Sequence, residues 1–299
     1  MKAWWAAHGP TRRRLIQVYA AVLYNAHLRG FAEGQIYKGP TKALCVPGLN
    51  CYSCPAAVAA CPLGALQNAV AASAHRPAFY AVGLLLLFGL TLGRTICGYL
   101  CPVGLMQELL YRIPSPKLKK SRATRRLSAL KYVLLGVLVL LIPAYYAWKD
   151  FPLPAFCKYV CPAGTLEGAV SLLLHPVNDG LRAGLGMLFT WKAFVLIAVL
   201  ITCVFVFRAF CRFLCPLGAI YSLFARIALL GVRVDESRCT DCGACVKICP
   251  VDIRRVGDRE CVQCGKCIGV CPVKAISLKA GKITLRENEC RPRGKEAAE

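Results

Sequence analysis

Two runs of cysteines near the C-terminus share one spacing. CTDCGACVKICP at 239–250 and CVQCGKCIGVCP at 261–272 both read C-x2-C-x2-C-x3-C-P. This pattern is typical of a pair of 4Fe-4S clusters in which the fourth cysteine of each run binds the cluster of the other run. A zinc site is the alternative, but two complete runs with trailing prolines do not match ordinary zinc spacings. The predicted ligand sets are Cys239, Cys242, Cys245 and Cys271, and Cys261, Cys264, Cys267 and Cys249.

A different cysteine motif occurs twice in the middle of the chain. GRTICGYLCPVGLMQEL and FRAFCRFLCPLGAIYSL align at Arg94 with Arg208 and at each cysteine, proline and glycine of R-x2-C-x3-C-P-x-G. The alternatives are structural cysteines at helix ends and arginines that only anchor the chain at a membrane surface. Because the whole motif is duplicated, we favour one shared cluster ligated by Cys97, Cys101, Cys211 and Cys215.

A third group of cysteines lies in segments that also repeat. The segment CPLGALQNAVAASAH at 61–75 is repeated as CPAGTLEGAVSLLLH at 161–175, and a repeat at a fixed period indicates internal duplication. The repeat favours a site of Cys54, Cys61, Cys157 and Cys161. The rival arrangement is Cys45, Cys51, Cys54 and Cys61, with the other two cysteines in a disulfide, as is plausible outside the cytoplasm.

The same repeat places two histidines at equivalent positions. His75 and His175 are candidates for a quinone headgroup site or for haem ligation, and the alternative is that they only cap helix ends. Of the remaining cysteines, Cys203 is expected to be a small core side chain. Cys290 has no partner spacing and receives no role.

The composition indicates a membrane protein. The chain has 299 residues, of which 57% are hydrophobic, and a mean hydropathy of +0.51, which is too apolar for an ordinary soluble domain. The formal net charge of +23 could also indicate nucleic-acid binding. No other feature supports nucleic acid, and anionic lipid headgroups explain the basic residues. We therefore expect lipid and no nucleic acid as a partner.

Four segments are predicted to span the membrane, at about 14–31, 78–96, 129–148 and 190–210. The first contains Asn25 and His27, and its alternative is an interfacial amphipathic helix. The segment 112–131 holds eight Lys and Arg and no acid, so we expect it on the cytoplasmic side. This topology predicts a multi-pass protein of a prokaryotic cytoplasmic membrane, with its N-terminus and C-terminal cysteine runs inside. No removable signal peptide is expected.

The predicted architecture has two domains and a tail. An all-α membrane domain of four helices with internal pseudo-twofold duplication is expected over 1–232. A small α+β domain with two 4Fe-4S clusters is expected over 233–285, followed by the tail 286–299.

The motifs resemble those of a known family. R-x2-C-x3-C-P-x-G motifs that close membrane spans, followed by a two-cluster module, resemble the NapH-type membrane polyferredoxins, which are quinol dehydrogenase subunits of respiratory chains, and their relatives in nitrous oxide reduction and copper-oxidase assembly. The resemblance covers roughly 90–280. It implies electron transfer between a quinone pool and iron-sulfur or flavin partners, within a larger and typically anaerobic respiratory complex. It implies that Cys97, Cys101, Cys211, Cys215 and the eight cysteines of the C-terminal runs are cluster ligands.

We therefore expect an electron-transfer subunit with no bond-making chemistry except quinone oxidation or reduction. It would hold two clusters in the C-terminal domain and one or two in the membrane domain. The alternative is a redox-sensing or metal-handling assembly protein whose clusters do not conduct. A span of 18 residues is about 27 Å long, which is a long single step for an electron. Either the C-P-x-G segments dip into the bilayer, or a quinone or haem fills the gap.

Overall fold

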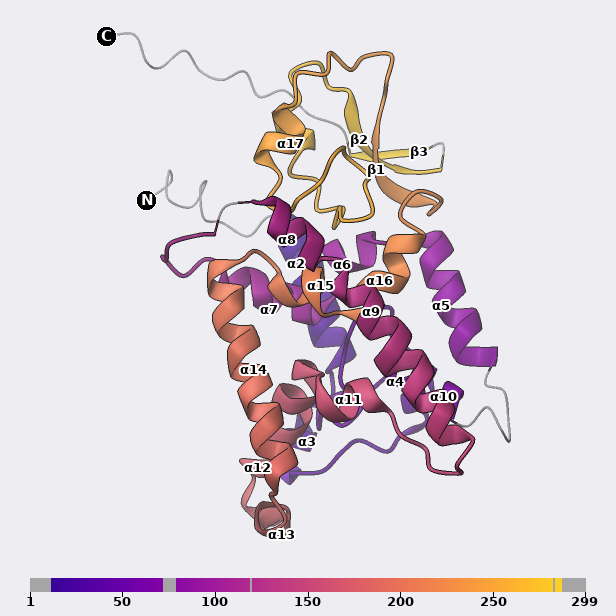
Figure 1. Cartoon of the computed structure of the whole chain (residues 1–299), viewed down its shortest axis with the longest axis vertical. Coiled ribbons are helices and arrows are strands. Elements are labelled where there is room, and N and C mark those ends of the chain that lie inside the picture. The colour runs from indigo at the N-terminus through magenta and orange to yellow at the C-terminus, as the bar shows by residue number, and fades with distance from the viewer. Residues whose placement is uncertain (1–11, 72–78, 119, 282, 287–299) are drawn as a thin grey trace.

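The computed structural model of the protein describes residues 12–71, 79–118, 120–281 and 283–286. Figure 1 shows a bundle of helices with a smaller lobe at one end, and the lobe contains the three-stranded sheet. Two residues of the sequence predictions, His75 and Cys290, lie outside the described residues.

The first described residues form a short helix. Helix α2 (Arg12–Tyr24) has 13 residues, and α3 (Arg29–Glu33) and a 3-10 turn (Pro40–Ala43) follow it. The helix ends where the Asn25 side chain donates back to the carbonyl oxygen of Ala21 over 3.0 Å, a local bond that competes with helix continuation. The segment 14–31 is therefore not the single spanning helix that the sequence predicted.

The second predicted span is also shorter than expected. After α4 (Pro62–Ala71), helix α5 covers Phe79–Thr91 and has 13 residues. It stops before Gly93, whose backbone φ of +50° lies in the left-handed region that favours glycine. Two more helices follow, α6 (Thr95–Tyr99) and α7 (Pro102–Leu110).

Two described helices are long and apolar enough to cross a membrane, by length and composition only. One runs over Arg122–Ala147 with a mean hydropathy of 2.2, and the other over Met187–Phe205 with 2.3. The first consists of α8 (Arg122–Leu127), α9 (Leu130–Leu134), a π-helical stretch (Leu135–Leu141) and α10 (Ile142–Ala147). The second is α14. They correspond to the spans predicted at 129–148 and 190–210.

The remaining helices are short and carry the cysteine motifs or connect them. They are α11 (Ala155–Tyr159), a π-helical turn η3 (Gly164–Val170), α12 (Ser171–Leu173), a 3-10 turn (Pro176–Asn178), α13 (Asp179–Ala183), α15 (Ala209–Phe213) and α16 (Pro216–Leu223).

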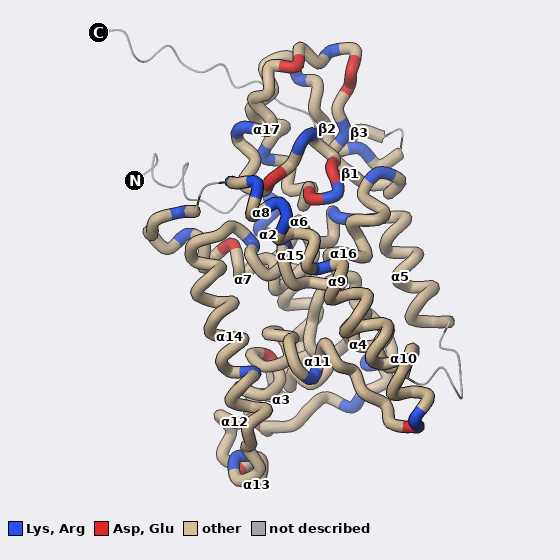
Figure 2. Tube along the Cα trace, in the orientation of Figure 1, with Lys and Arg blue, Asp and Glu red and all other residues tan. Residues whose placement is uncertain are grey.

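Apolar side chains on the long helices face outward. Phe194, Ile197 and Ile201 on α14 are each more than half exposed, and Figure 2 shows that α5 and most of α14 carry no charged residue. A contiguous apolar surface of this kind marks contact with lipid or with another protein.

The lobe is a three-stranded antiparallel sheet with two loops of cysteines packed on it. Strands β1 (Leu230–Val234), β2 (Ile276–Ala280) and β3 (Ile283–Arg286) pair in the order β1-β2-β3. Helix α17 (Ala244–Ile248) and a 3-10 turn (Ile268–Val270) carry part of the cysteine runs. Val232, Ile268 and Ile276 are almost fully buried and form the core of the lobe.

The lobe lies directly on the bundle. A Cβ added to Gly98 in α6 would lie 2.6 Å from the carbonyl oxygen of Val262 in the lobe, so only a glycine permits this approach. The contact brings the second cysteine run of the lobe against the first R-x2-C-x3-C-P-x-G motif.

Candidate iron-sulfur centres

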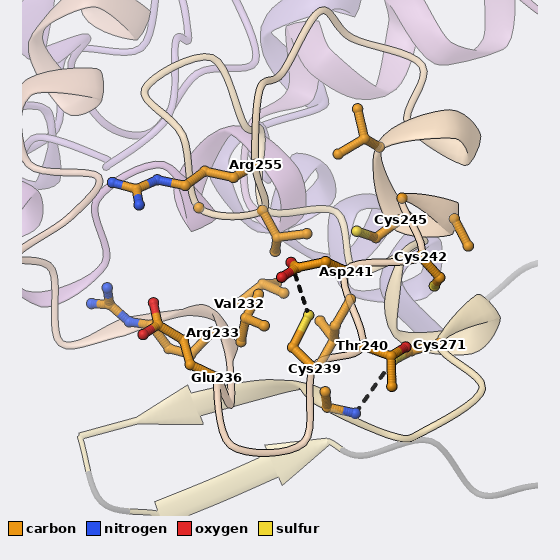
Figure 3. A pocket seen from close by; sticks show the side chains of 18 of the residues that line it. Val232, Arg233, Glu236, Cys239, Thr240, Asp241, Cys242, Cys245, Arg255 and Cys271 are labelled. Atoms are coloured by element: carbon orange, nitrogen blue, oxygen red, sulfur yellow. Dashed lines mark hydrogen bonds between the residues drawn. The ribbon is translucent and has the colours of Figure 1, made fainter.

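The distal set of lobe cysteines surrounds an open cavity. Cys239, Cys242, Cys245 and Cys271 all line a cavity of about 720 Å³ (Figure 3). Cys242 is exposed, and the amide of Ala275 donates to the Cys271 thiol over 3.3 Å. The structure thus brings together one complete ligand set in the combination that the spacing predicted.

The proximal set of lobe cysteines is more buried. Cys249, Cys261, Cys264 and Cys267 line a second, much smaller cavity. Burial raises the pKa of the Cys267 thiol, and the neighbouring thiols of this set raise it further. The fourth cysteine of each run therefore lies with the first three of the other, which is the exchange typical of two-cluster ferredoxins.

Each C-x3-C-P motif in the bundle has the same local structure. The first cysteine lies in a five-residue helix, as Cys97 does in α6 and Cys211 in α15. The second cysteine is extended, because it precedes a proline, and it caps the next helix with that proline at the first position. The thiol of Cys215 accepts a hydrogen bond from the amide of Gly218 over 3.3 Å. The motif thus presents both thiols at one helix junction.

The inner set consists of Cys97, Cys101, Cys211 and Cys215, all of them buried in one continuous core cluster. Burial raises the pKa of Cys101 to about 12, and the neighbouring thiols of Cys211 and Cys97 contribute to the rise. The two copies of the motif therefore meet at one place, as the duplication predicted.

Two fully buried arginines flank the inner set. Arg94 donates toward the Cys97 thiol over 3.9 Å, and Arg208 donates to the Cys97 carbonyl oxygen. A Cβ added to Gly104 would lie 3.4 Å from the Arg208 guanidinium, and one on Gly218 would lie 3.2 Å from that of Arg94. Each arginine thus packs on the C-P-x-G glycine of the other half, which explains why arginine and glycine occur together in the motif.

Buried carboxylates neutralise these arginines. Glu108 accepts from Arg208 over 2.9 Å and from Arg13 over 3.0 Å. Burial alone would raise the pKa of Glu108, but the two guanidinium groups outweigh it and lower the pKa. On the lobe side, Glu260 lies 3.7 Å from the Arg94 guanidinium and 2.6 Å from Lys131 Nζ. The charged network thus continues from the inner set into the lobe.

A buried glutamine braces the inner set from the other half. Gln107 Nε2 donates to the Cys211 thiol over 3.0 Å, while its Oε1 accepts from the amide of Phe210 over 3.1 Å. The same carbonyl oxygen accepts from the thiol of Cys203 over 3.6 Å. Cys203 is fully buried, as expected for a core side chain.

The cysteines of the segments 45–61 and 157–161 are called the outer set. Their arrangement favours a combination of ligands other than the one that the repeat favoured. Burial raises the pKa of Cys161, and the neighbouring thiols that contribute are Cys157, Cys61 and Cys51. Cys54 packs with Ala56, Ala57 and Cys51, and the charged groups that contribute most to its pKa shift are Glu167 and Lys42 rather than the other thiols. For Cys45, the neighbouring thiol that contributes to the pKa shift is Cys61. We therefore revise the proposed outer ligands to Cys51, Cys61, Cys157 and Cys161.

The outer set has a brace that matches the inner one. Gln67 Nε2 donates to the Cys157 thiol over 3.0 Å, and its Oε1 accepts from the amide of Phe156 over 3.0 Å. The equivalent residue of the second half is Glu167, which accepts from the amide of Cys51 over 2.7 Å. Burial raises the pKa of Glu167 to about 7, with the Cys51 hydrogen bond acting in the opposite direction.

The described histidine of the repeat is engaged with the backbone. His175 Nε2 bonds the carbonyl oxygen of Ala32 over 2.9 Å, and its Nδ1 accepts from the amide of Val177 over 3.3 Å. Neither ring nitrogen is left for a haem iron, and the geometry favours the alternative of a helix-end cap.

Each of the four sets offers four thiols, the number of ligands that a 4Fe-4S cluster takes. Within the described ranges no three His, Cys, Asp or Glu side chains are arranged to hold one metal ion. Asn50, whose backbone lies close to the Cys61 thiol, has a buried Nδ2 with no partner among the described residues, and cluster sulfur is an acceptor.

Sequence reasoning missed the residues that support the sets. Gln67, Gln107 and Glu167 all occur six positions after the cysteine of a C-P-x-G segment. The signal was therefore in the repeat alignment, although alignment alone does not show that these side chains reach the opposite half. Glu108 and Glu260 carried no comparable signal.

Two family models match the chain. A 4Fe-4S binding domain matches three times, at 74–121, 132–176 and 187–234, and a second 4Fe-4S binding domain matches at 232–255 and 257–277. The first model follows the motifs of the bundle, and the second follows the lobe.

Curated relatives match over slightly more than half of the chain. An uncharacterized protein of Methanocaldococcus jannaschii is 29% identical, over 57% of this chain and 64% of its own length. The putative electron transport protein YccM of Escherichia coli is 27% identical over 60% of this chain and 47% of its own. The methylamine utilization ferredoxin-type protein MauN of Methylorubrum extorquens is 32% identical over 58% and 53%.

The chain thus spans about half to two-thirds of the length of these relatives. No solved structure matches it. The ranges that the two domain models match contain the cysteine motifs of the bundle and of the lobe. On this evidence the chain carries 4Fe-4S binding domains, and it is similar to ferredoxin-type proteins and to a putative electron transport protein.

Proposed function

We propose that the protein is a membrane electron carrier that passes electrons between a redox partner at the exposed lobe and a quinone or partner subunit at the membrane. The apolar outer faces of α14 and of the 122–147 helix support a membrane location. The basic segment 112–131 supports a cytoplasmic lobe.

The observation that carries this proposal is the adjacency of the cysteine sets. The charge of Arg208 acts on Cys97 and Cys211 of the inner set and also on Cys264 of the proximal lobe set. The charge of Arg94 likewise acts on Cys97 and Cys261. A Cβ on Gly98, next to Cys97, would lie 2.6 Å from the carbonyl oxygen of Val262, next to Cys261. The inner and proximal sets thus face each other across the contact between bundle and lobe, and the distal set lines the open cavity.

The protein's own residues position and tune the centres. A bound 4Fe-4S cluster takes up and releases one electron at a time. The arginines and the Gln107 amide stabilise negative charge at the inner thiolates, and the buried packing excludes water from them. The ion pairs of Glu260 with Arg94 and Lys131 hold the lobe against the bundle.

The test is the iron and acid-labile sulfide content of anaerobically purified, detergent-solubilised protein. About sixteen irons per chain, from four clusters of four, are expected. A content of about eight would mean that only the lobe is loaded, and would contradict the membrane part of the proposal. Oxidation of the reduced protein by a water-soluble quinone then tests the quinone as acceptor.

A further inference from the structure

A short stretch of chain lies between the inner and outer sets. Val46, Leu49 and Asn50 are buried, although the loop that carries them belongs to the outer half of the bundle. A Cβ added to Gly48 would lie 3.1 Å from Cys101 Cα and 3.2 Å from the carbonyl oxygen of Leu100. The loop therefore enters the core until its backbone touches an inner ligand.

Consecutive residues of this stretch lie close to cysteines of different sets. The backbone of Leu49 lies close to the thiol of Cys101, an inner ligand. The backbone of Asn50 lies close to the thiol of Cys61, an outer ligand, and Asn50 directly precedes Cys51 in the chain. The stretch thus leads from the inner set to the outer set.

Tyr221 fixes the stretch in this place. Its hydroxyl donates to the carbonyl oxygen of Pro47 over 2.8 Å, and its side chain is fully buried. The thiols of Cys97 and Cys61 lie among its charged neighbours. Leu49, Tyr221 and six cysteines of the two sets belong to one continuous core cluster.

We propose that residues 47–50 form the path along which electrons pass between the inner and outer clusters, with Tyr221 as the residue that positions this path. The inference rests on the proposed function, because it requires clusters at both sets. One electron leaves one centre and enters the other, so that the first is oxidised and the second reduced by one electron. No bond forms or breaks, no proton moves, and Tyr221 keeps its oxidation state.

With this path, an electron does not need to move in one step over the full length of a membrane span. A direct step along a span of 18 residues would cover about 27 Å, whereas here Gly48 packs against the inner ligand Cys101 and the outer ligand Cys51 follows shortly after it in the chain. Irregular backbone is tolerated at membrane depth where protein buries it around a cofactor. Neither a quinone nor a haem is needed between the two centres.

The first measurement is the EPR signal of the outer centre in fully reduced, full-length protein, with iron per chain determined on the same sample. Its signal should be broadened by a magnetic interaction with the inner centre. Cys215→Ser, which removes an inner ligand, should sharpen it. An outer signal that is identical in both proteins would overturn the proposed adjacency while leaving the proposed function intact.

The second measurement is the rate of electron exchange between the two centres after flash photoreduction. Gly48→Ala should slow the exchange several-fold, because its Cβ must push the stretch away from Cys101, and Tyr221→Phe should slow it less. Gly83→Ala is the control, since a Cβ there meets nothing within 4 Å.

The outcomes separate the two proposals. Unchanged exchange in Gly48→Ala with about sixteen irons per chain would overturn the path alone. About eight irons in the unmodified protein would overturn the membrane centres, and the path with them. If Gly48→Ala loses iron, the exchange rate of Tyr221→Phe with a full iron content tests the path instead.

Discussion

The inner and outer centres are built on the same motif but differ in charge. At both, a buried glutamine of the first half donates to the first cysteine of a C-x3-C-P motif in the second half. The inner centre adds two buried arginines, and the outer centre has the buried carboxyl of Glu167 instead. Since nearby charge shifts the potential of a cluster, the two proposed clusters would have different potentials on the same duplicated scaffold.

The difference also shows in the packing of the motif glycines. At the inner centre, a Cβ added to Gly104 or Gly218 would lie within contact distance of an arginine of the other half. At the outer centre, a Cβ on Gly64 or Gly164 would meet only cysteine atoms, at 3.8 and 3.9 Å. A Cβ on Gly104 or Gly218 would also lie 3.2 or 3.3 Å from the carbonyl oxygen of Cys97 or Cys211, so the inner glycines are tightly packed, whereas the outer ones leave room for a methyl group.

The largest expected effect is the loss of a whole centre. Cys97→Ser should remove the inner cluster and Cys51→Ser the outer one, so that each lowers the iron content by about four per chain and leaves the lobe signals intact. Cys54→Ser is the control, because its thiol faces Lys42 and backbone amides. If Cys54→Ser loses the cluster and Cys51→Ser keeps it, the alignment of the repeat was the better guide to the outer centre.

The next largest effect is expected from the removal of the Glu108 carboxylate, which pairs with Arg208 and Arg13. Glu108→Gln leaves Arg13 and Arg208 without their buried partner, which typically costs about 3 to 5 kcal/mol of stability. Because the pKa of Glu108 is lowered, its contribution is complete above its ordinary value of 4.5 and is lost only as pH falls through the lowered pKa. The variant should therefore lower the melting temperature equally at pH 6 and pH 8.

The control for this prediction is an exposed ion pair. Glu33→Gln breaks the pair between Glu33 and Arg29, whose side chains are 41% and 80% exposed, and such pairs contribute about 0 to 1 kcal/mol. Equal melting temperatures for the two variants would show that the inner charge network does not stabilise the fold.

The sequence predicted the lobe better than the bundle. The spacing of eight cysteines predicted which four of them line each cavity of the lobe, because each run is short and the pattern is specific. The long apolar segments at 129–148 and 190–210 also correspond to helices of spanning length. The segments at 14–31 and 78–96 are interrupted by Asn25 and Gly93, whose local bonds and backbone conformation outweigh their apolar surroundings.

The outer centre could not be predicted in full for a different reason. The repeat alignment paired Cys54 with Cys157 by allowing for an insertion before Cys61. Such an alignment does not show where the inserted residues lie in the folded chain. The loop at 45–61 enters the core and turns at Cys54, which leaves Cys51 beside Cys161. Contacts between the two halves, such as those of Gln67 and Gln107, depend on the assembled bundle and have no local pattern.

The two glutamine braces allow a matched test of the comparison. Gln107→Leu and Gln67→Leu each leave a buried backbone amide without its acceptor, at a cost of about 1 to 3 kcal/mol. Each also removes a donor to a ligand sulfur, which should lower the potential of that cluster. Potentiometric EPR titration should show a shift of the inner centre alone in Gln107→Leu and of the outer centre alone in Gln67→Leu. A shift of both centres in either variant would mean that the braces act through the fold.

The smallest expected effect concerns the carboxyl that distinguishes the outer centre. At pH 9, above the raised pKa of Glu167 of about 7, Glu167→Gln keeps an oxygen that can accept from the Cys51 amide and removes the negative charge. A cluster beside one fewer negative charge is easier to reduce, so the outer potential should rise by about 60 mV, a tenfold change for a one-electron couple. The inner potential should stay unchanged, because Arg94 and Arg208 dominate its surroundings. Gln67→Glu is the converse variant at the equivalent position and should lower the same potential. If both variants leave the outer potential unchanged, the charge of residues 67 and 167 does not cause the difference in potential between the two centres. The arginines of the inner centre alone must then account for that difference.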